Sequence, residues 1–381
     1  MKTDQIQKVH KDWYKLDLSA IVYPTLQRRD FSSVYRLSVL VKEDIDPEIL
    51  QRAVNLTMPR FPTYKAAIRK GVFWRYLEPN DRPGPFVQED VKNPCQPMHF
   101  KGNNRYLVRI YYYRNRIALE AHHSLGDGTG GMCVLQTLTA TYLRLKGHSE
   151  IENGGFVLDI LGIPDPGELE DAYMKYANAK VCPPRPGEKT YRVRGTKEPF
   201  YTLNIIDGIM SVSEVMRVAK SYNATITEYL NSVLLYALMR KQESEWHLKL
   251  RPVKIAMPVN LRRFFPSRTL RNFITMIYPG IDPRLGEYTF EEIVTQVHNY
   301  MRYYLNEKLL RGDITTNAET QRNPFIRIVP LFIKDLVVRQ FYTKIQDKNS
   351  SAGLTNMGAL KVPETMKPYI ERFDNYMRQP Y

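Results

Sequence analysis

Hydrophobic positions in the first part of the chain follow the spacings of strands and helices. Apolar and polar residues alternate over 31–41, which predicts a half-buried strand. A helix is expected next, because Asp46-Pro47 supplies a cap and a first-turn proline before apolar residues at helical spacing: Ile49, Leu50, Ala53 and Leu56. The pattern also predicts a helix over 133–146 and strands over 72–77, 106–113 and 117–121, the last two forming a hairpin across Arg114-Asn115.

The second half shows the same kinds of element in a similar order. A short strand is expected over 201–206 and a helix over 211–222. Thr225 and Thr227 are expected to cap a longer helix through Met239, with Glu228 completing a capping box. The other expected elements are strands over 253–257, 273–278 and 352–355, an amphipathic helix over 290–305, and a helix over 322–339 with a break at Pro330.

The stretch between the halves, 147–200, has little periodicity and many prolines, with only a short helix expected over 168–179. A long irregular segment inside one compact domain is unusual, so we place a domain boundary here. A chain of 381 residues fits two domains of roughly 150 residues each. We therefore expect an N-terminal lobe over 1–150, a connection over 151–200 and a C-terminal lobe over 201–381.

The amino-acid composition and net charge limit the classes of binding partner that are expected. Hydrophobic residues make up 43% of the chain, enough for real cores, so disorder is not expected. The net charge of +15 suits nucleic acid, an anionic membrane, or an anionic small molecule or acidic protein. The densest basic stretch, 251–271, is interrupted by an apolar run, and no nucleic-acid-binding motif accompanies it. Nucleic acid is therefore not an expected partner, and a solvated basic surface accounts for most of the charge.

The cysteines and the apolar runs bear on the compartment. The three cysteines, Cys95, Cys133 and Cys182, are odd in number and widely spaced, so neither a disulfide framework nor a metal site is expected. The N-terminal residues 1–14 are polar, without a signal-like apolar core. The longest apolar run, 233–239, is far shorter than the roughly 20 residues of a spanning helix. We predict a cytoplasmic protein with no transmembrane segment, and a peripheral membrane contact stays open.

The clearest candidate for chemistry is the run from His122 to Gly128, which reads His-His-Ser-Leu-Gly-Asp-Gly. Neighbouring residues on a strand point to opposite faces, so the two histidines are poor candidates for joint metal ligands, and no metal is expected. A neutral imidazole at His123 suits a general base. Asp127 could orient it directly or by bracing the turn. Taken singly, these residues also fit a core histidine beside a helix cap.

Together, these residues match the signature HHxxxDG. The chain resembles the acyltransferase superfamily of chloramphenicol acetyltransferase, the condensation domains of non-ribosomal peptide synthetases, and plant, yeast and bacterial acyltransferases, and it is most similar to the bacterial alcohol-acetyltransferase-like branch. Other segments share the resemblance: Leu16-Asp17, Arg60-Phe61-Pro62, Pro258-Val259-Asn260-Leu261-Arg262, Asn272-Phe273 and Thr355-Asn356-Met357-Gly358. It covers residues 14 to 358, and motif matches of this kind need structural context.

The resemblance implies an α/β (mixed α+β) fold of two chloramphenicol-acetyltransferase-like domains, with mixed sheets flanked by helices and a central tunnel. His123 would be the general base for transfer of an acyl group from an acyl thioester to an alcohol or amine, without a covalent acyl-enzyme. His122 would be a support residue, and Asp127 would be structural, paired with an arginine such as Arg262. Thr355 or Asn356, before Gly358, would stabilise the oxyanion, although a simple turn at Asn356 is the competing interpretation.

Acyl-coenzyme A is the expected co-substrate, and no tightly bound cofactor is expected. Basic residues at the tunnel mouth would help to capture it, and the candidates are Lys254, Arg262, Arg263 and Arg268. An acyl chain on an acidic carrier protein is an alternative donor that suits the charge equally. A non-catalytic relative is a third hypothesis, against which His122, His123, Asp127 and Gly128 speak.

Two features depart from the superfamily. The Asp-Phe-Gly-Trp-Gly segment of the plant branch does not occur. The chain also ends 23 residues after Gly358 (381 minus 358), whereas relatives continue with further strands and a helix. The second lobe is therefore expected to be truncated or reduced.

Overall fold

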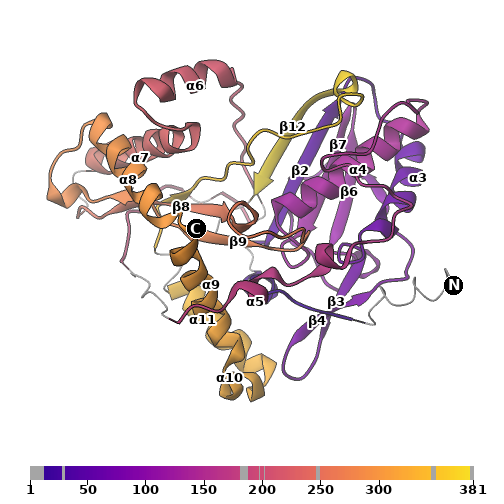
Figure 1. The fold of residues 1–381 in the computed structure, drawn as a ribbon, viewed down its shortest axis with the longest axis horizontal. Coiled ribbons are helices and arrows are strands. Elements are labelled where there is room, and N and C mark those ends of the chain that lie inside the picture. The colour runs from indigo at the N-terminus through magenta and orange to yellow at the C-terminus, as the bar shows by residue number, and fades with distance from the viewer. Residues whose placement is uncertain are drawn as a thin grey trace.

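The structure, a computed structural model, describes residues 13–27, 31–180, 188–196, 198–200, 202–245, 249–344 and 349–377. Most of the polar stretch 1–14 and Cys182 lie outside these residues. Two lobes lie side by side, each with its own sheet and helices (Figure 1). None of the helices in the described ranges is long and apolar enough to cross a lipid bilayer.

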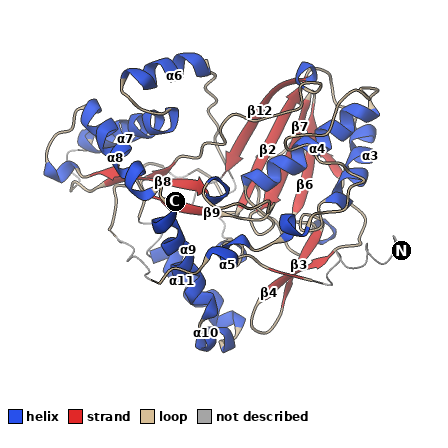
Figure 2. Cartoon of the chain, in the orientation of Figure 1, coloured by secondary structure: helices blue, strands red, loops and turns tan. Residues whose placement is uncertain are grey.

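The first lobe is built on a five-stranded sheet in the order β12-β2-β7-β6-β5. All neighbours are antiparallel except β5 and β6. Figure 2 shows β12, β2, β7 and β6 side by side in this sheet. The hairpin across Arg114-Asn115 is confirmed in β6 and β7. The strand expected over 31–41 is present as β2, but it is buried on both faces and not half-buried, since Arg36 and Ser38 are 3% and 0% exposed. The strands are β2 (Val34–Val41), β5 (Val87–Glu89), β6 (Val108–Tyr113), β7 (Arg116–His122) and β12 (Ile370–Met377).

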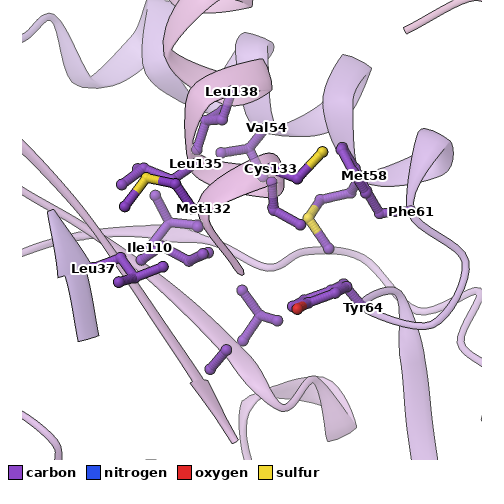
Figure 3. Packing of buried hydrophobic residues seen from close by; sticks show 14 of the residues in the cluster. Leu37, Val54, Met58, Phe61, Tyr64, Ile110, Met132, Cys133, Leu135 and Leu138 are labelled. Atoms are coloured by element: carbon purple, nitrogen blue, oxygen red, sulfur yellow. The ribbon is translucent and has the colours of Figure 1, made fainter. Parts of the chain in front are cut away.

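Two helices, α3 (Pro47–Thr57) and α4 (Gly128–Leu145), pack together on this sheet. Asp46 caps α3 as expected, accepting hydrogen bonds from the first-turn amides. Leu56, expected on the buried side, is instead exposed, because only one face of α3 meets the core. Figure 3 shows side chains of both helices packed with those of the strands, among them Val54, Leu135, Leu138, Leu37 and Ile110.

A smaller sheet in the order β1-β4-β3 lies at the edge of the first lobe. The strand expected over 72–77 is wrong in its first residues, since 71–74 form a turn closed by the Gly71 amide on the Trp74 carbonyl at 2.8 Å. The strands are β1 (Tyr14–Lys15), β3 (Ala66–Lys70) and β4 (Arg75–Pro79).

The second lobe centres on β8, which pairs antiparallel with β9 and β10 and parallel with β11. The capping box of Thr225 and Glu228 is present at the start of α7, as predicted. The strands are β8 (Val253–Asn260), β9 (Ile274–Ile277), β10 (Gly280–Ile281) and β11 (Ala352–Gly353). The helices around them are α6 (Val212–Ser221), α7 (Ile226–Ser244) and α8 (Phe290–Tyr304).

Further helices run along the junction of the lobes. The expected break at Pro330 is confirmed, since it separates α10 from α11. The helix α9 was not expected, because its sequence has few apolar residues. These helices are α2 (Tyr23–Leu26), α5 (Ala172–Tyr176), α9 (Glu307–Arg322), α10 (Pro324–Ile328) and α11 (Leu331–Lys344).

Two features of the second half differ from expectation. The strand expected over 201–206 is wrong, because 202–206 has no regular structure and Tyr201 lies outside the described residues. The strand β12 was not expected, and it pairs with β2 of the first lobe although it comes from the range 201–381. The chain therefore returns to its first sheet, while the lobe limits 1–150, 151–200 and 201–381 stay a prediction.

The start of α4 approaches the second lobe so closely that Gly130 has no space for a side chain. A Cβ there would overlap the Leu270 carbonyl oxygen and lie 2.7 Å from the Tyr64 hydroxyl. We predict that Gly130→Ala lowers the free energy of unfolding by about 1–3 kcal/mol in urea titrations, since backbone must move. Gly128→Ala is the control, because its Cβ would meet only the flexible Met357 side chain. Equal stability of the two variants would contradict this view of the lobe contact.

Candidate active site

His123 lies just past the end of β7, where the two lobes meet. Its amide donates to the Ser33 carbonyl at 2.9 Å, and its own carbonyl accepts from Asn272 Nδ2 at 2.9 Å. Ser33 belongs to the first lobe and Asn272 to the second. The backbone of His123 is thus fixed from both sides, which limits where the imidazole can point.

Aromatic rings surround the His123 imidazole. Tyr23 stacks on it with 4.8 Å between ring centroids, and Tyr35 lies tilted at 4.7 Å. Met377 Sδ lies 3.3 Å from Nε2, whereas Nδ1 is buried and has no hydrogen-bond partner among the described residues. Burial lowers the pKa of His123 to about 4, although Asp127 and Asn272 act in the opposite direction. At neutral pH the ring is therefore uncharged and able to accept a proton.

His122 points to the other side of the strand, as the alternation predicts. Its Nδ1 accepts a hydrogen bond from the Ser124 amide at 3.2 Å, and its ring meets Phe100 edge-on. Burial, followed by the nearby His123, lowers its pKa to about 3. It is a neutral packing residue in this structure.

Asp127 is the polar centre of the lobe contact. Its Oδ1 accepts from the amides of Thr129 and Gly130 and so caps α4. Its Oδ2 accepts from Arg262 Nη1 at 2.8 Å and from the Phe273 amide at 2.9 Å, both in the second lobe. Of the two sequence interpretations, this geometry matches bracing of the turn. The pairing with Arg262 is the one that the resemblance implied.

Arg262 is held as firmly as its partner. It donates from Nε to the Thr269 carbonyl at 2.9 Å and from Nη2 to the Arg271 carbonyl at 2.6 Å. Asn260 accepts from the Arg262 amide and guanidinium, and its own amide donates to Thr129 of the first lobe at 3.2 Å. The segment from Asn260 to Arg262 is thus rigidly held and fixes the loop that carries Asp127 through hydrogen bonds.

A second polar link lies behind His123. Asn272 Nδ2 also donates to the buried Asp17 carboxylate at 3.1 Å, and Arg271 approaches that carboxylate at 3.7 Å. Burial raises the pKa of Asp17, although Arg271 and Asn272 lower it. Asp17 and Asn272, which the resemblance singled out in separate segments, therefore meet beside the candidate base.

A cavity of about 2240 Å³ lies between the lobes and is lined by several of the candidate residues, although His122 and Gly358 do not line it. His123, Asp127, Gly128 and Thr129 line it from the first lobe, with Asn260, Thr355 and Asn356 from the second. Lys254 and Arg263 line it as well. Arg262 instead faces Asp127, and Arg268 is exposed beside Asp165. Two of the four basic residues expected to capture coenzyme A, Lys254 and Arg263, thus line the cavity.

The late segment forms a turn at the cavity wall. Asn356 Nδ2 donates to Thr227 Oγ1 at 2.8 Å, and its Oδ1 accepts from the Gly358 amide at 2.7 Å. Gly358 has φ of +71°, a conformation that favours glycine. This is the turn that the competing interpretation described, so the oxyanion role of Thr355 or Asn356 stays a prediction.

Three residues near the imidazole were not expected from the sequence: Tyr23, Tyr35 and Met377. Tyr35 could have been found, because it shares the buried face of a strand that pairs beside β7. Met377 carries no local signal, since it reaches His123 only through the pairing of β12 with β2. In the described ranges no cluster of three His, Cys, Asp or Glu side chains is arranged to hold a metal ion.

Comparison with known proteins relates this arrangement to solved structures. Polyketide synthase associated protein 5 from Mycobacterium tuberculosis aligns over 95% of this chain and 84% of its own, at 14% identity and TM-score 0.53. A mutant starter condensation domain of rhizomide synthetase RzmA, solved with C8-CoA, aligns over 99% and 85%, at 12% identity and TM-score 0.57. TRI101 from F. graminearum, solved with coenzyme A and T-2 mycotoxin, aligns over 97% and 90%, at 10% identity and TM-score 0.57.

No protein-family model and no curated protein sequence matches the chain. At these low identities the structural likeness establishes the fold. The chain has the two-lobed α/β fold of condensation domains, with mixed sheets flanked by helices. The fold class expected from the sequence is confirmed, whereas the particular branch stays a prediction.

The Asp127–Arg262 pair predicts a large stability effect. Both side chains are nearly buried, so removing one leaves an unpaired charge inside the protein. We expect Arg262→Ala to lower the free energy of unfolding by about 3–5 kcal/mol in urea titrations. Arg268→Ala, which breaks an exposed pair with Asp165, should cost less than about 1 kcal/mol. Similar losses in both variants would contradict the special role of the buried pair.

Proposed function

We propose that this protein transfers an acyl group from an acyl-coenzyme A thioester to an alcohol or amine, with His123 as general base. The observation that carries the proposal is a neutral, buried imidazole that faces a cavity built from both lobes. The fold supports it, since RzmA and TRI101 were solved with C8-CoA and coenzyme A. The match to HHxxxDG adds the acyltransferase chemistry of the superfamily that the sequence resembles.

The reaction needs only one proton acceptor. The hydroxyl or amine of the acceptor gives its proton to His123 as the oxygen or nitrogen attacks the thioester carbonyl carbon. The tetrahedral intermediate then collapses, the carbon–sulfur bond breaks, and the imidazolium returns the proton to the departing coenzyme A thiolate. Atoms and charge balance without a covalent acyl-enzyme.

Met377 marks where the acceptor would bind. Its sulfur lies against Nε2, the ring nitrogen that faces away from the buried Nδ1. An unbranched thioether side chain adapts easily. The acceptor would displace this side chain and place its hydroxyl or amine at the same nitrogen.

The oxyanion of the intermediate needs a hydrogen-bond donor. Thr129 is a candidate beside Thr355 and Asn356, because its oxygen already accepts from Asn260 and its own proton is left for a ligand. One amide hydrogen of Asn356 is already donated to the Thr227 hydroxyl oxygen. Thr355 lines the cavity with an exposed side chain.

Mass spectrometry of acyl transfer tests the function. Purified protein would be mixed with acetyl-, octanoyl- or palmitoyl-coenzyme A and a pool of alcohols and amines. An acylated product would establish the activity and rank the chain lengths. Product from octanoyl carrier protein alone would assign the donor to a carrier instead. A folded protein that gives no product with any donor would contradict the proposal.

We predict that His123→Ala lowers turnover by roughly 10²–10⁴, the usual contribution of a positioned general base. His99→Ala is the matched control, because His99 is exposed and does not line the cavity. Thermal unfolding of both variants would show that the fold is kept. Full activity of His123→Ala would exclude the base role.

The lowered pKa of His123 predicts an unusual pH profile. An imidazole acts as a base only when unprotonated, so activity is lost as pH falls through the pKa of about 4. With an alcohol acceptor, which does not titrate in this range, we expect kcat/KM to be level between about pH 6 and about pH 8. Met377→Ala, which uncovers the ring, should move the acidic fall to higher pH. A wild-type fall centred on the ordinary histidine pKa of about 6.5 would contradict this burial argument.

A further inference from the structure

The helix α11 turns two of its charged residues, Lys334 and Asp335, toward the protein. Lys334 Nζ donates to the carbonyls of Phe73 at 2.9 Å and Arg327 at 3.2 Å. The Asp335 carboxylate accepts from Arg75 Nη1 and from Thr25 Oγ1, each at 2.8 Å. These contacts fix the rotation of the helix on the first lobe.

The opposite side of α11 is apolar and exposed. Phe332 and Leu336, four residues apart, are 73% and 60% exposed, and Ile333 and Val337 form a second exposed pair. A helix on the surface of a globular protein normally turns such a stripe toward the core. Here the side that carries Lys334 and Asp335 contacts the protein, whereas the side that carries the four apolar residues faces outward.

Neighbouring segments extend this apolar surface. Phe325 and Ile328 of α10 are exposed, as are Val72 and Trp74 in the β3–β4 turn. The Leu331 amide donates to the Val72 carbonyl at 2.8 Å, so the turn is attached to the start of α11. Figure 1 shows α10 and the β3–β4 hairpin at the same end of the molecule. We call this surface the apolar end: Val72, Trp74, Phe325, Ile328, Phe332, Ile333, Leu336 and Val337.

The charge around the apolar end is positive. Residues 322–340 contain three exposed basic residues, Arg322, Arg327 and Arg339, and only one acidic residue, Asp335, which is paired with Arg75. A second copy of the chain packed on this surface would bring like charges together. Aromatic and aliphatic side chains with a basic border are what an anionic lipid surface binds.

The apolar end is continuous with the cavity that contains His123. Phe73, Trp74, Ile326, Leu331 and Val337 line that cavity. A lipid surface at this end would therefore lie at an opening of the ligand space.

We propose that the apolar end docks this protein on an anionic lipid surface as a peripheral membrane protein. The test is co-sedimentation of the full chain with vesicles of phosphatidylcholine alone or with one quarter phosphatidylserine. Binding should be stronger to the vesicles that contain phosphatidylserine and weaken in high salt. It is measured without substrate, so its outcome is independent of the acyltransferase proposal.

Paired variants test whether vesicle binding depends on the apolar end or on nonspecific adsorption of any exposed apolar residue. Phe332→Ser/Leu336→Ser should lower the vesicle partition constant at least about tenfold. Ile206→Ser/Ile209→Ser removes two apolar residues elsewhere that are even more exposed, and it should leave binding unchanged. Arg327→Ala, which keeps every apolar residue, should lower binding about fivefold on phosphatidylserine vesicles and little on neutral ones.

Three outcomes would overturn the proposal. The first is a wild-type protein that stays in solution with both kinds of vesicle, and the second is a Phe332→Ser/Leu336→Ser variant that binds as tightly as wild type. The third is a dimer in light scattering that this variant converts to a monomer, which would assign the apolar end to a second copy of the chain.

Discussion

The Asp127 carboxylate is the constraint on which the rest of the site depends. One oxygen caps α4 of the first lobe, and the other binds Arg262 and the Phe273 amide of the second lobe. Burying a carboxylate costs much free energy unless hydrogen bonds or ion pairs satisfy the lone pairs of its oxygens. The lobes therefore have one relative placement that meets this need, and that placement sets the cavity between them. We propose that Asp127 holds the two lobes in position and takes no part in proton transfer.

The same burial determines the chemistry available to His123. Packing against Tyr23 and Tyr35 removes water from the imidazole and disfavours its charged form. The ring is thus ready as a base across the neutral range, although its low pKa also makes it a weak one. Asn272 compensates by fixing the His123 backbone and by joining it to Asp17. The rate of proton transfer therefore depends on how precisely the His123 imidazole is positioned, since its basicity is low.

Much of this arrangement follows from local sequence, and the remainder depends on long-range pairing. The cap at Asp46, the capping box at Thr225 and the break at Pro330 were predictable, because each depends on residues a few positions apart. The strand β12 was not, since its pairing with β2 joins segments more than 300 residues apart and local alternation does not identify a partner. Met377 was missed for that reason, and α9 was missed because its polar sequence gives no clear period.

The central claim is direct transfer from the thioester to an acceptor whose proton His123 takes. Rapid-quench measurement of coenzyme A release, with and without acceptor, tests it most directly when the protein's intact mass is recorded in parallel. The account predicts release only when acceptor is present, with the mass of the protein unchanged throughout. A burst of coenzyme A equal to the enzyme concentration without acceptor, together with acylated protein, would contradict it.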